Sequence, residues 1–205
     1  ILLYINGEKT DYKPFINVKK EGEYEIKIIF NVALTTFMGL FFECKNIIEI
    51  DLSNFDTKNI KNMSHMFSFC ERLNKFNLSN INTKNVTNMS WMFNGCWYLK
   101  EINLLDFDTN NVIDMSLMFC GCQKLEKINL MKFDTNKVIN IRIMFCNCRK
   151  LFSANLSNFI IKDESNIGNI FLNFKNLTII KVNDKKSRVA ILNNEVNGRQ
   201  NQYNY

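Results

Sequence analysis

The sequence predicts an α/β solenoid with one short parallel strand and one short helix in each 26-residue rung, preceded by an N-terminal β-hairpin cap. Two observations support this fold class. Cysteine recurs every 26 residues, at Cys44, Cys70, Cys96, Cys122 and Cys148. Leucine or valine recurs with the same step, at Leu52, Leu78, Leu104, Leu130, Leu156 and Val182. A fixed period of this length is typical of a solenoid, in which each repeat stacks on its neighbours.

The stretch from Asn85 to Leu104 contains both elements of one rung. Its first half is predicted to be an amphipathic helix, because apolar residues from Val86 to Cys96 recur at helical spacing. Its second half is predicted to be a strand, because Leu99, Ile102 and Leu104 are apolar and Glu101 and Asn103 between them are polar. Equivalent strands are expected at Ile47–Leu52, Leu73–Leu78 and in later rungs.

A bend joins each strand to the next helix. It reads FDTKN at Phe55–Asn59, FDTNN at Phe107–Asn111 and FDTNK at Phe133–Lys137. Asp, Thr and Asn hydrogen-bond to their own backbone in turns and helix caps, so they are expected to do so here. The residues before each Asp are expected to stack inward as a ladder: Phe55, Ile81, Phe107 and Phe133.

The repeat divides the chain into three predicted parts: an N-terminal β cap at 1–33, the solenoid at 34–182, and a C-terminal cap strand with a flexible tail at 183–205. In the cap, Leu2–Ile5 and Glu23–Phe30 read as strands, and Asn6-Gly7 is a strong hairpin turn signal. In the last part, Arg188–Leu192 is predicted to form the edge strand, and the polar residues after it the tail.

The composition argues against several functional classes. The net charge is +6, but the basic residues are scattered and form no run typical of a nucleic-acid or lipid site. No stretch of 18 apolar residues is present to span a membrane. The chain starts at Ile1, so we interpret it as a fragment or a processed protein. About one residue in six is asparagine, which we interpret as a coding bias.

A longer motif, MF-x-x-C-x-x-L-x-x-I/F, stands at Met66–Phe76, Met92–Ile102 and Met118–Ile128, and in weaker form at Met144–Ala154. Together with the bend sequence at Leu52–Ser64, it resembles the BspA-like leucine-rich repeat family in its 26-residue surface-protein variety. The resemblance covers Leu34 to Val182 and implies a leucine-rich-repeat solenoid. It also implies a role in surface adhesion or protein recognition, no enzymatic activity and no catalytic residues. The chain departs from ordinary leucine-rich repeats, because the asparagine ladder after the strand is missing.

Two surfaces are candidates for binding a partner. The first is the outward face of the sheet, where Asn77, Asn103 and Asn129 should align beside a column of alternating charge. This face is either a polar surface whose side chains bond to one another or a concave surface that binds a partner. The second is the column Trp91, Leu117 and Ile143, which follows His65 and should face outward. It is either an exposed apolar patch or one half-covered by neighbouring rungs, and Trp91 is the expected hot spot.

No residues point to catalysis, a cofactor or a metal. His65 is the only histidine, and no nucleophile or carboxylate recurs beside it. The cysteines at 26-residue spacing should form a buried column of small apolar side chains. Cys120 and Cys146 lie outside that column, and three alternatives stay open for them: a disulfide between the two, a metal site shared with Cys122 and Cys148, or inert thiols.

The sequence therefore predicts a non-enzymatic recognition module that binds a protein partner or a surface glycoprotein through its repeat surface, without nucleic acid, cofactor or membrane insertion. The alternative is a structural component of an intracellular assembly, packed along the solenoid. The first would place the protein at the cell surface or outside the cell, and the second in the cytoplasm or cytoskeleton.

Overall fold

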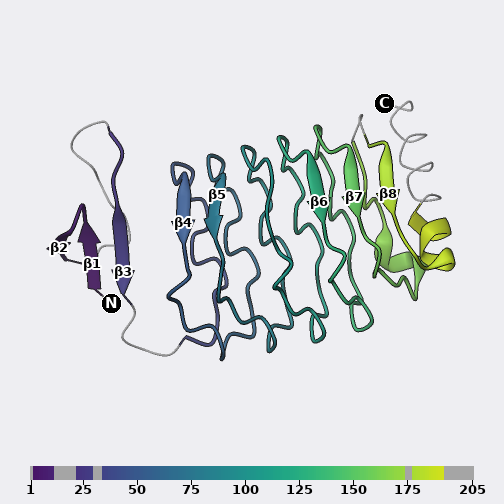
Figure 1. Ribbon diagram of the computed structural model, residues 1–205, viewed down its shortest axis with the longest axis horizontal. Helices are drawn as coiled ribbons and strands as arrows, with labels where there is room; N and C mark the ends of the chain where they lie inside the picture. Colours follow the sequence, from purple (N-terminus) through teal and green to yellow (C-terminus); the bar gives the residue numbers. More distant parts are fainter. Residues whose placement is uncertain (1, 12–21, 30–33, 174–176, 192–205) are drawn as a thin grey trace. The chain divides into compact units, whose positions relative to one another are not determined.

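The computed structural model describes residues 2–11, 22–29, 34–173 and 177–191. In these residues the protein is α/β, with few helical residues and several short strands in open sheets (Figure 1). The chain divides into two compact parts, Ile1–Leu34 and Thr35–Tyr205. We call them the N-terminal unit and the repeat region, and each is described by itself.

The N-terminal unit contains a three-stranded antiparallel sheet in the order β2-β1-β3, formed by β1 (Leu2–Ile5), β2 (Glu8–Thr10) and β3 (Ile26–Ile29). The predicted hairpin is confirmed: Asn6 and Gly7 both have positive φ, 49° and 83°, as a type I′ turn requires. The Asn6 side chain also accepts a hydrogen bond from the amide of Glu25 at 2.8 Å, which ties the turn to the chain entering β3. Phe30, the predicted end of this strand, lies outside the described residues.

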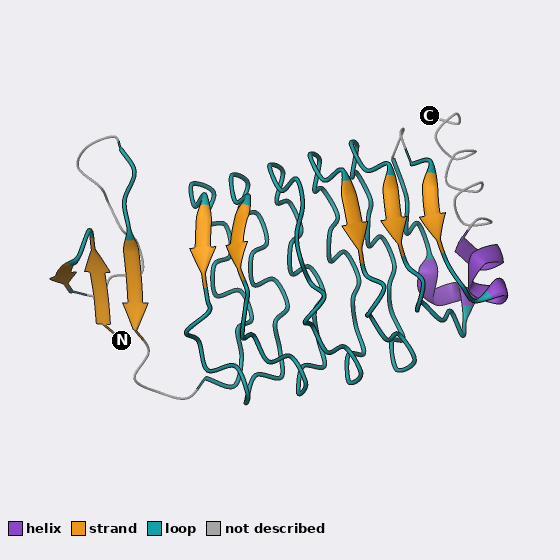
Figure 2. Cartoon of the chain, in the orientation of Figure 1, coloured by secondary structure: helices purple, strands orange, loops and turns teal. Residues whose placement is uncertain are grey.

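The repeat region has its strands along one side, which we call the sheet side (Figure 2). They are β4 (Glu49–Asp51), β5 (Lys75–Asn77), β6 (Lys127–Asn129), β7 (Ser153–Asn155) and β8 (Ile179–Lys181). β4 pairs with β5, and β7 pairs with both β6 and β8, always parallel and with partners 26 residues apart, such as Glu49 and Lys75. The predicted register is therefore observed between these strands.

The predicted strand Leu99–Leu104 is wrong, because this segment has no strand residues. It still follows the repeat: Leu99 and Leu104 are buried like their equivalents in other repeats, and Figure 1 shows the segment running between β5 and β6. The sheet side thus consists of a two-stranded and a three-stranded sheet separated by one irregular repeat. The structure gives no physical reason for this interruption.

The opposite side of each repeat carries the residues predicted to be helical, and this prediction is wrong. We call it the turn side; it includes residues 60–70 and their equivalents, which form successive turns. Within a repeat, amides bond three residues back, as Ser68 does to His65 at 3.1 Å. The intervening amides bond to the next repeat instead, as His65 does to Ser90 at 3.0 Å and Phe67 to Met92 at 2.9 Å. Successive turns of three residues place apolar side chains at nearly the same spacing as a helix does. The apolar pattern of the sequence therefore does not distinguish these turns from a helix.

Left-handed backbone recurs at two positions of every turn-side segment, which also rules out a helix there. One column has φ between 55° and 63°: Gly39, His65, Trp91, Leu117, Ile143 and Asn169. The other has φ between 59° and 78°: Glu43, Phe69, Gly95, Gly121, Asn147 and Asn173. In the first column, only Gly39 and Asn169 are of the residue types that favour this conformation. For the larger residues, left-handed backbone costs about 1–2 kcal/mol each, so packing between repeats must hold them in it.

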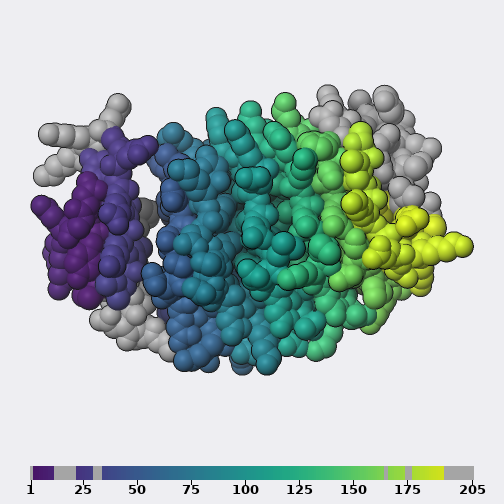
Figure 3. All heavy atoms as spheres, in the orientation of Figure 1, coloured from purple at the N-terminus to yellow at the C-terminus, as the bar shows by residue number. Residues whose placement is uncertain are grey.

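The core between the two sides is built from columns of identical residues. Phenylalanine rings stack with centroids 5.2–5.7 Å apart in neighbouring repeats: Phe41, Phe67, Phe93, Phe119, Phe145 and Phe171. The ladder predicted at the bend lies inward as expected at Ile81, Phe107 and Phe133, which are buried. Phe55 is half-buried and packs edge-to-face on Phe37 at 5.2 Å. The space-filling view shows neighbouring repeats in continuous contact on the visible face (Figure 3).

The C-terminal end of the repeat region is helical where an edge strand was predicted. After the 3₁₀ helix η1 (Glu164–Ile167) and β8, residues 185–191 have helical backbone, and Leu192 and the predicted tail lie outside the described residues. Asp184 caps this helix by accepting a hydrogen bond from the Ser187 amide at 2.6 Å. Ala190 and Ile191 are buried. A short apolar run does not distinguish a strand from a helix, and the cap decides it here.

Candidate partner-binding surfaces

The sheet side exposes the predicted row of asparagines. Asn77, Asn103 and Asn129 are all exposed; Asn77 ends β5, Asn129 ends β6, and Asn103 lies at the equivalent position of the irregular segment. Each Oδ1 accepts a hydrogen bond from the amide two residues later, at 3.1–3.3 Å. This Asx turn fixes the side chain, so the row presents amide groups in one repeated orientation.

The row is partly self-paired at its N-terminal end. Asn77 Nδ2 donates to Asp51 at 3.0 Å. Hydrogen bonds from Ser53, and then from Asn77, lower the pKa of Asp51. In the adjoining column Lys75 forms an ion pair with Glu49 at 3.3 Å, as the sign alternation predicts, while Lys127 lies over the Phe152 ring at 5.3 Å. The predicted self-paired polar face is therefore observed at the N-terminal repeats, and the binding surface stays a prediction.

Asx turns give a structural role to some of the asparagines whose abundance we interpreted as a coding bias. Three columns of Asn or Asp side chains accept a hydrogen bond from the amide two residues ahead. The columns are 51, 77, 103, 129 and 155; then 56, 82, 108 and 134; then 62, 88, 114 and 140. The last column coincides with isolated parallel bridges between repeats. Each turn of the repeat is thus stabilised by its own side chain.

The column Trp91, Leu117 and Ile143 lies on the turn side, and all three side chains are half-buried. Their left-handed backbone, not a helix, sets their direction. The His65 ring stacks on Trp91 with centroids 5.2 Å apart and an angle of 17°. Burial lowers the pKa of His65, so this ring stays neutral at pH 7. Of the two predicted alternatives, the structure has the half-covered column.

Other apolar side chains are more exposed than this column and were not singled out for binding. Trp97 and Tyr98 expose 39% and 51% of their surface in the turn before the irregular segment. Ile113 and Ile139 expose 43% and 62%, and they are neighbours because the Ile139 amide bonds to the Ile113 carbonyl at 2.9 Å. The 26-residue spacing of Ile113 and Ile139 was a usable signal, but the incorrect helix obscured which positions face outward.

The cysteine column is buried as predicted, except at Cys44, which is half-buried. Each Sγ donates to the carbonyl of a phenylalanine 29 residues earlier at 3.0–3.2 Å: Cys70, Cys96, Cys122 and Cys148. Burial raises the pKa of Cys70 to about 12 and raises the pKa of the other three as well. These thiols stay protonated and unreactive at pH 7. Cys120 and Cys146 are free thiols in a separate column, and their contact is described below.

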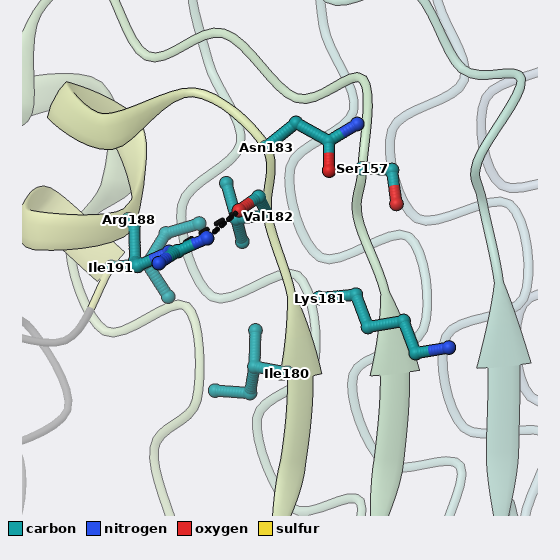
Figure 4. A pocket seen from close by; sticks show the side chains of 7 residues that line it. All are labelled: Ser157, Ile180, Lys181, Val182, Asn183, Arg188 and Ile191. Atoms are coloured by element: carbon teal, nitrogen blue, oxygen red, sulfur yellow. Dashed lines mark hydrogen bonds between the residues drawn. The ribbon is translucent and has the colours of Figure 1, made fainter.

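The described residues contain no cluster of three or more His, Cys, Asp or Glu side chains that could hold a metal ion. Within the same ranges, no helix has the length and apolar character needed to cross a membrane. A hollow of about 440 Å³ opens beside β8, and Figure 4 shows Arg188 reaching across it. Arg188 donates twice to the Val182 carbonyl, at 3.2 and 2.8 Å, so it fastens the terminal helix to β8. Its described lining includes Ser157 and Lys181, with no histidine or carboxylate among the lining residues.

A family model described as "Mycoplasma protein of unknown function, DUF285" matches residues 17–101 and again residues 75–185. The two matches overlap and together extend over most of the repeat region. No curated protein and no solved structure matches the chain.

Proposed function

Because the chain belongs to the family of Mycoplasma proteins of unknown function DUF285, whose description names no activity, we propose its function from its surface: it is a non-enzymatic recognition module. In this proposal the repeat region is a leucine-rich-repeat-like solenoid of the kind the motif resembles. It binds a protein partner or a surface glycoprotein through the sheet side.

The solenoid proposal is supported by the stacking of equivalent residues. Parallel bridges join four successive pairs on the turn side: Thr36 to Asn62, Asn62 to Asn88, Asn88 to Asp114, and Asp114 to Asn140. The phenylalanine stack follows the same path with nearly parallel rings. A stack of this kind presents equivalent side chains at a constant interval, which is how repeat proteins create extended binding surfaces.

The row of exposed asparagines carries the recognition proposal. Asn103 and Asn129 use Oδ1 in their own Asx turns and present Nδ2 outward. A fixed donor loses little side-chain entropy when it binds, so an ordered row of amides suits carbonyl- or hydroxyl-rich partners. The exposed rings of Trp97 and Tyr98 supply the aromatic area that interfaces favour.

Binding to a panel of purified extracellular-matrix glycoproteins, each also tested after enzymatic deglycosylation, tests this proposal by surface plasmon resonance. Asn103→Asp keeps the Asx-turn acceptor and removes the outward donor, so we expect affinity to fall about tenfold, the effect of one lost hydrogen bond at an interface. Trp91→Ala should leave the affinity unchanged, because Trp91 lies on the turn side and the proposed binding surface is the sheet side.

Asn110→Asp is the matched control, since Asn110 is exposed at the bend and its side chain is in a different column. It carries the same charge change and should leave affinity unaltered. Equal losses for Asn103→Asp and Asn110→Asp would indicate a general charge effect. Unchanged binding in Asn103→Asp, or no binding to any member of the panel, would contradict the proposal.

A second candidate, a structural component packed along the stack, is favoured by Ile113 and Ile139. Two neighbouring exposed isoleucines on the turn side offer a lateral apolar contact. Sedimentation velocity at increasing concentration should then detect association that Ile139→Lys abolishes and Lys132→Glu does not. A monomer at all concentrations would exclude this candidate.

A further inference from the structure

Cys120 and Cys146 occupy the same position in neighbouring repeats. Their amides make the same internal turn, to Leu117 and to Ile143 at 3.1 and 3.2 Å. The Gly95 amide bonds to the Cys120 carbonyl at 2.8 Å, and the Gly121 amide bonds to the Cys146 carbonyl at 2.7 Å. The two residues are therefore adjacent across one inter-repeat ladder, about 4.8 Å apart at the backbone. A disulfide requires a Cα separation of about 4.4–6.8 Å.

The two thiols interact with each other, and each is less deeply buried than the cysteine two residues after it. The Cys120 thiol donates a hydrogen bond to the Cys146 sulfur, which raises the pKa of Cys120 and lowers the pKa of Cys146. Cys120 is half-buried and Cys146 keeps 5% of its surface exposed, whereas Cys96, Cys122 and Cys148 are fully buried. Thiolate character and access decide which cysteines react with oxidants.

The same column carries different residues in the other repeats. It reads Phe42, Ser68, Asn94, Cys120, Cys146 and Leu172. Only two consecutive positions hold thiols, so within this column each sulfur has one partner. Serine already occupies the position at Ser68, which indicates that a cysteine-to-serine change here does not disrupt the stack.

We propose that Cys120 and Cys146 form an oxidation-dependent cross-repeat disulfide, with a peroxide as the oxidant. The Cys146 thiolate attacks one oxygen of hydrogen peroxide, the O–O bond breaks, and hydroxide leaves. The Cys120 sulfur then attacks the Cys146 sulfenic acid, the S–S bond forms, and water leaves with the proton of Cys120. In total, two thiols lose two protons and two electrons, and one peroxide gains them and becomes two waters.

The test is mass spectrometry of the full chain after treatment with equimolar hydrogen peroxide, quenching and alkylation. The expected product lacks two hydrogen atoms and two alkylation sites. Trypsin should leave residues 101–124 linked to residues 143–149. The bond should raise the melting temperature by about 5–10 °C for a loop of this length, and a reducing agent should reverse the change.

Each of the two linked peptides contains two cysteines, so single variants are needed to show which sulfurs form the bond. Cys120→Ser and Cys146→Ser should each abolish the linked product, and Cys44→Ser, a half-buried cysteine outside the pair, should retain it. The proposal is overturned by a product that persists in Cys120→Ser or by a bond through Cys122 or Cys148. It is equally overturned by peroxide adding oxygen atoms to single cysteines without forming a link.

Discussion

The sheet side and the turn side of the repeat region both connect neighbouring repeats, but the connections are continuous on only one of them. The sheet side has strands of three residues each, and the irregular segment Leu99–Leu104 separates its two sheets. The turn side has one uninterrupted series of parallel bridges from Thr36 to Asn140, beside a phenylalanine stack from Phe41 to Phe171. The side without regular secondary structure therefore forms the more continuous contact between repeats.

The difference teaches that packing and inter-repeat hydrogen bonds, not strand length, define this stack. On the turn side, alternate amides from Lys61 to Phe69 are bonded to a neighbouring repeat, and those of Met66, Ser68 and Cys70 are bonded within their own turn. Amides that a helix would need are therefore bonded between repeats. If this interpretation is correct, mutations on the turn side should cost more free energy of unfolding than equivalent mutations on the sheet side.

Phenylalanine occurs on both sides, which permits a direct comparison. Phe93 is fully buried between two stacked rings at 5.4 and 5.5 Å, whereas Phe76 in β5 is half-buried and packs on Phe67 and Phe93 edge-to-face. Phe93→Ala should lower the free energy of unfolding by about 3–5 kcal/mol. Phe76→Ala should lower it by about 1–3 kcal/mol. Urea unfolding measures both, and a larger loss for Phe76→Ala would reverse the comparison.

The glycines of the second left-handed column separate backbone strain from crowding. A Cβ at Gly95 would lie 2.6 Å from the Phe69 ring, while a Cβ at Gly121 would meet nothing closer than 3.4 Å; φ is 69° and 78°. Gly121→Ala should cost about 1 kcal/mol for the left-handed backbone alone. Gly95→Ala should cost about 2–4 kcal/mol, because overpacking adds to it. Equal losses in thermal unfolding would show that the Phe69 ring moves aside freely.

The bend threonine Thr109 is expected to stabilise the fold through a hydrogen bond to the next repeat. Thr109 is buried, and its hydroxyl donates to the Asp134 carbonyl of the next repeat at 3.0 Å. Thr109→Val should lower the free energy of unfolding by about 1–2 kcal/mol, because a carbonyl loses its partner. Thr87→Val is the control: its hydroxyl bonds to the Lys61 carbonyl at 3.2 Å but is exposed, so water replaces it. A loss as large for Thr87→Val would argue against the importance of burial.

The smallest effect is expected at Ile143. A β-branched residue with φ of 60° is strained, and asparagine tolerates this backbone. Ile143→Asn should therefore change the free energy of unfolding by no more than about 0.5 kcal/mol, since relief of strain offsets lost apolar contact. Ile102 is also half-buried but does not have positive φ, and Ile102→Asn should cost about 1–2 kcal/mol. Denaturation of both variants gives the comparison, and equal costs would mean that the strain at Ile143 is small.

The candidate surfaces were only partly predictable from sequence. The row of Asn77, Asn103 and Asn129 and the ion pair of Glu49 with Lys75 follow from alternation and the 26-residue step. The half-burial of Trp91, Leu117 and Ile143 does not, because it depends on left-handed backbone that large residues rarely adopt. Ile113 and Ile139 were missed because assigning a helix to this segment gives the wrong set of outward positions.

The sequence by itself determined the repeat length, the parallel register and the inward columns. Equal spacing forces equivalent residues into contact, and apolar side chains identify which of them are buried. Only the tertiary structure decided that the segments resembling helices are turns, that 185–191 is a helix, and that Thr109 bonds to the next repeat. These features depend on hydrogen-bond partners about 25 residues away, and local patterns of apolar residues carry no information about such partners.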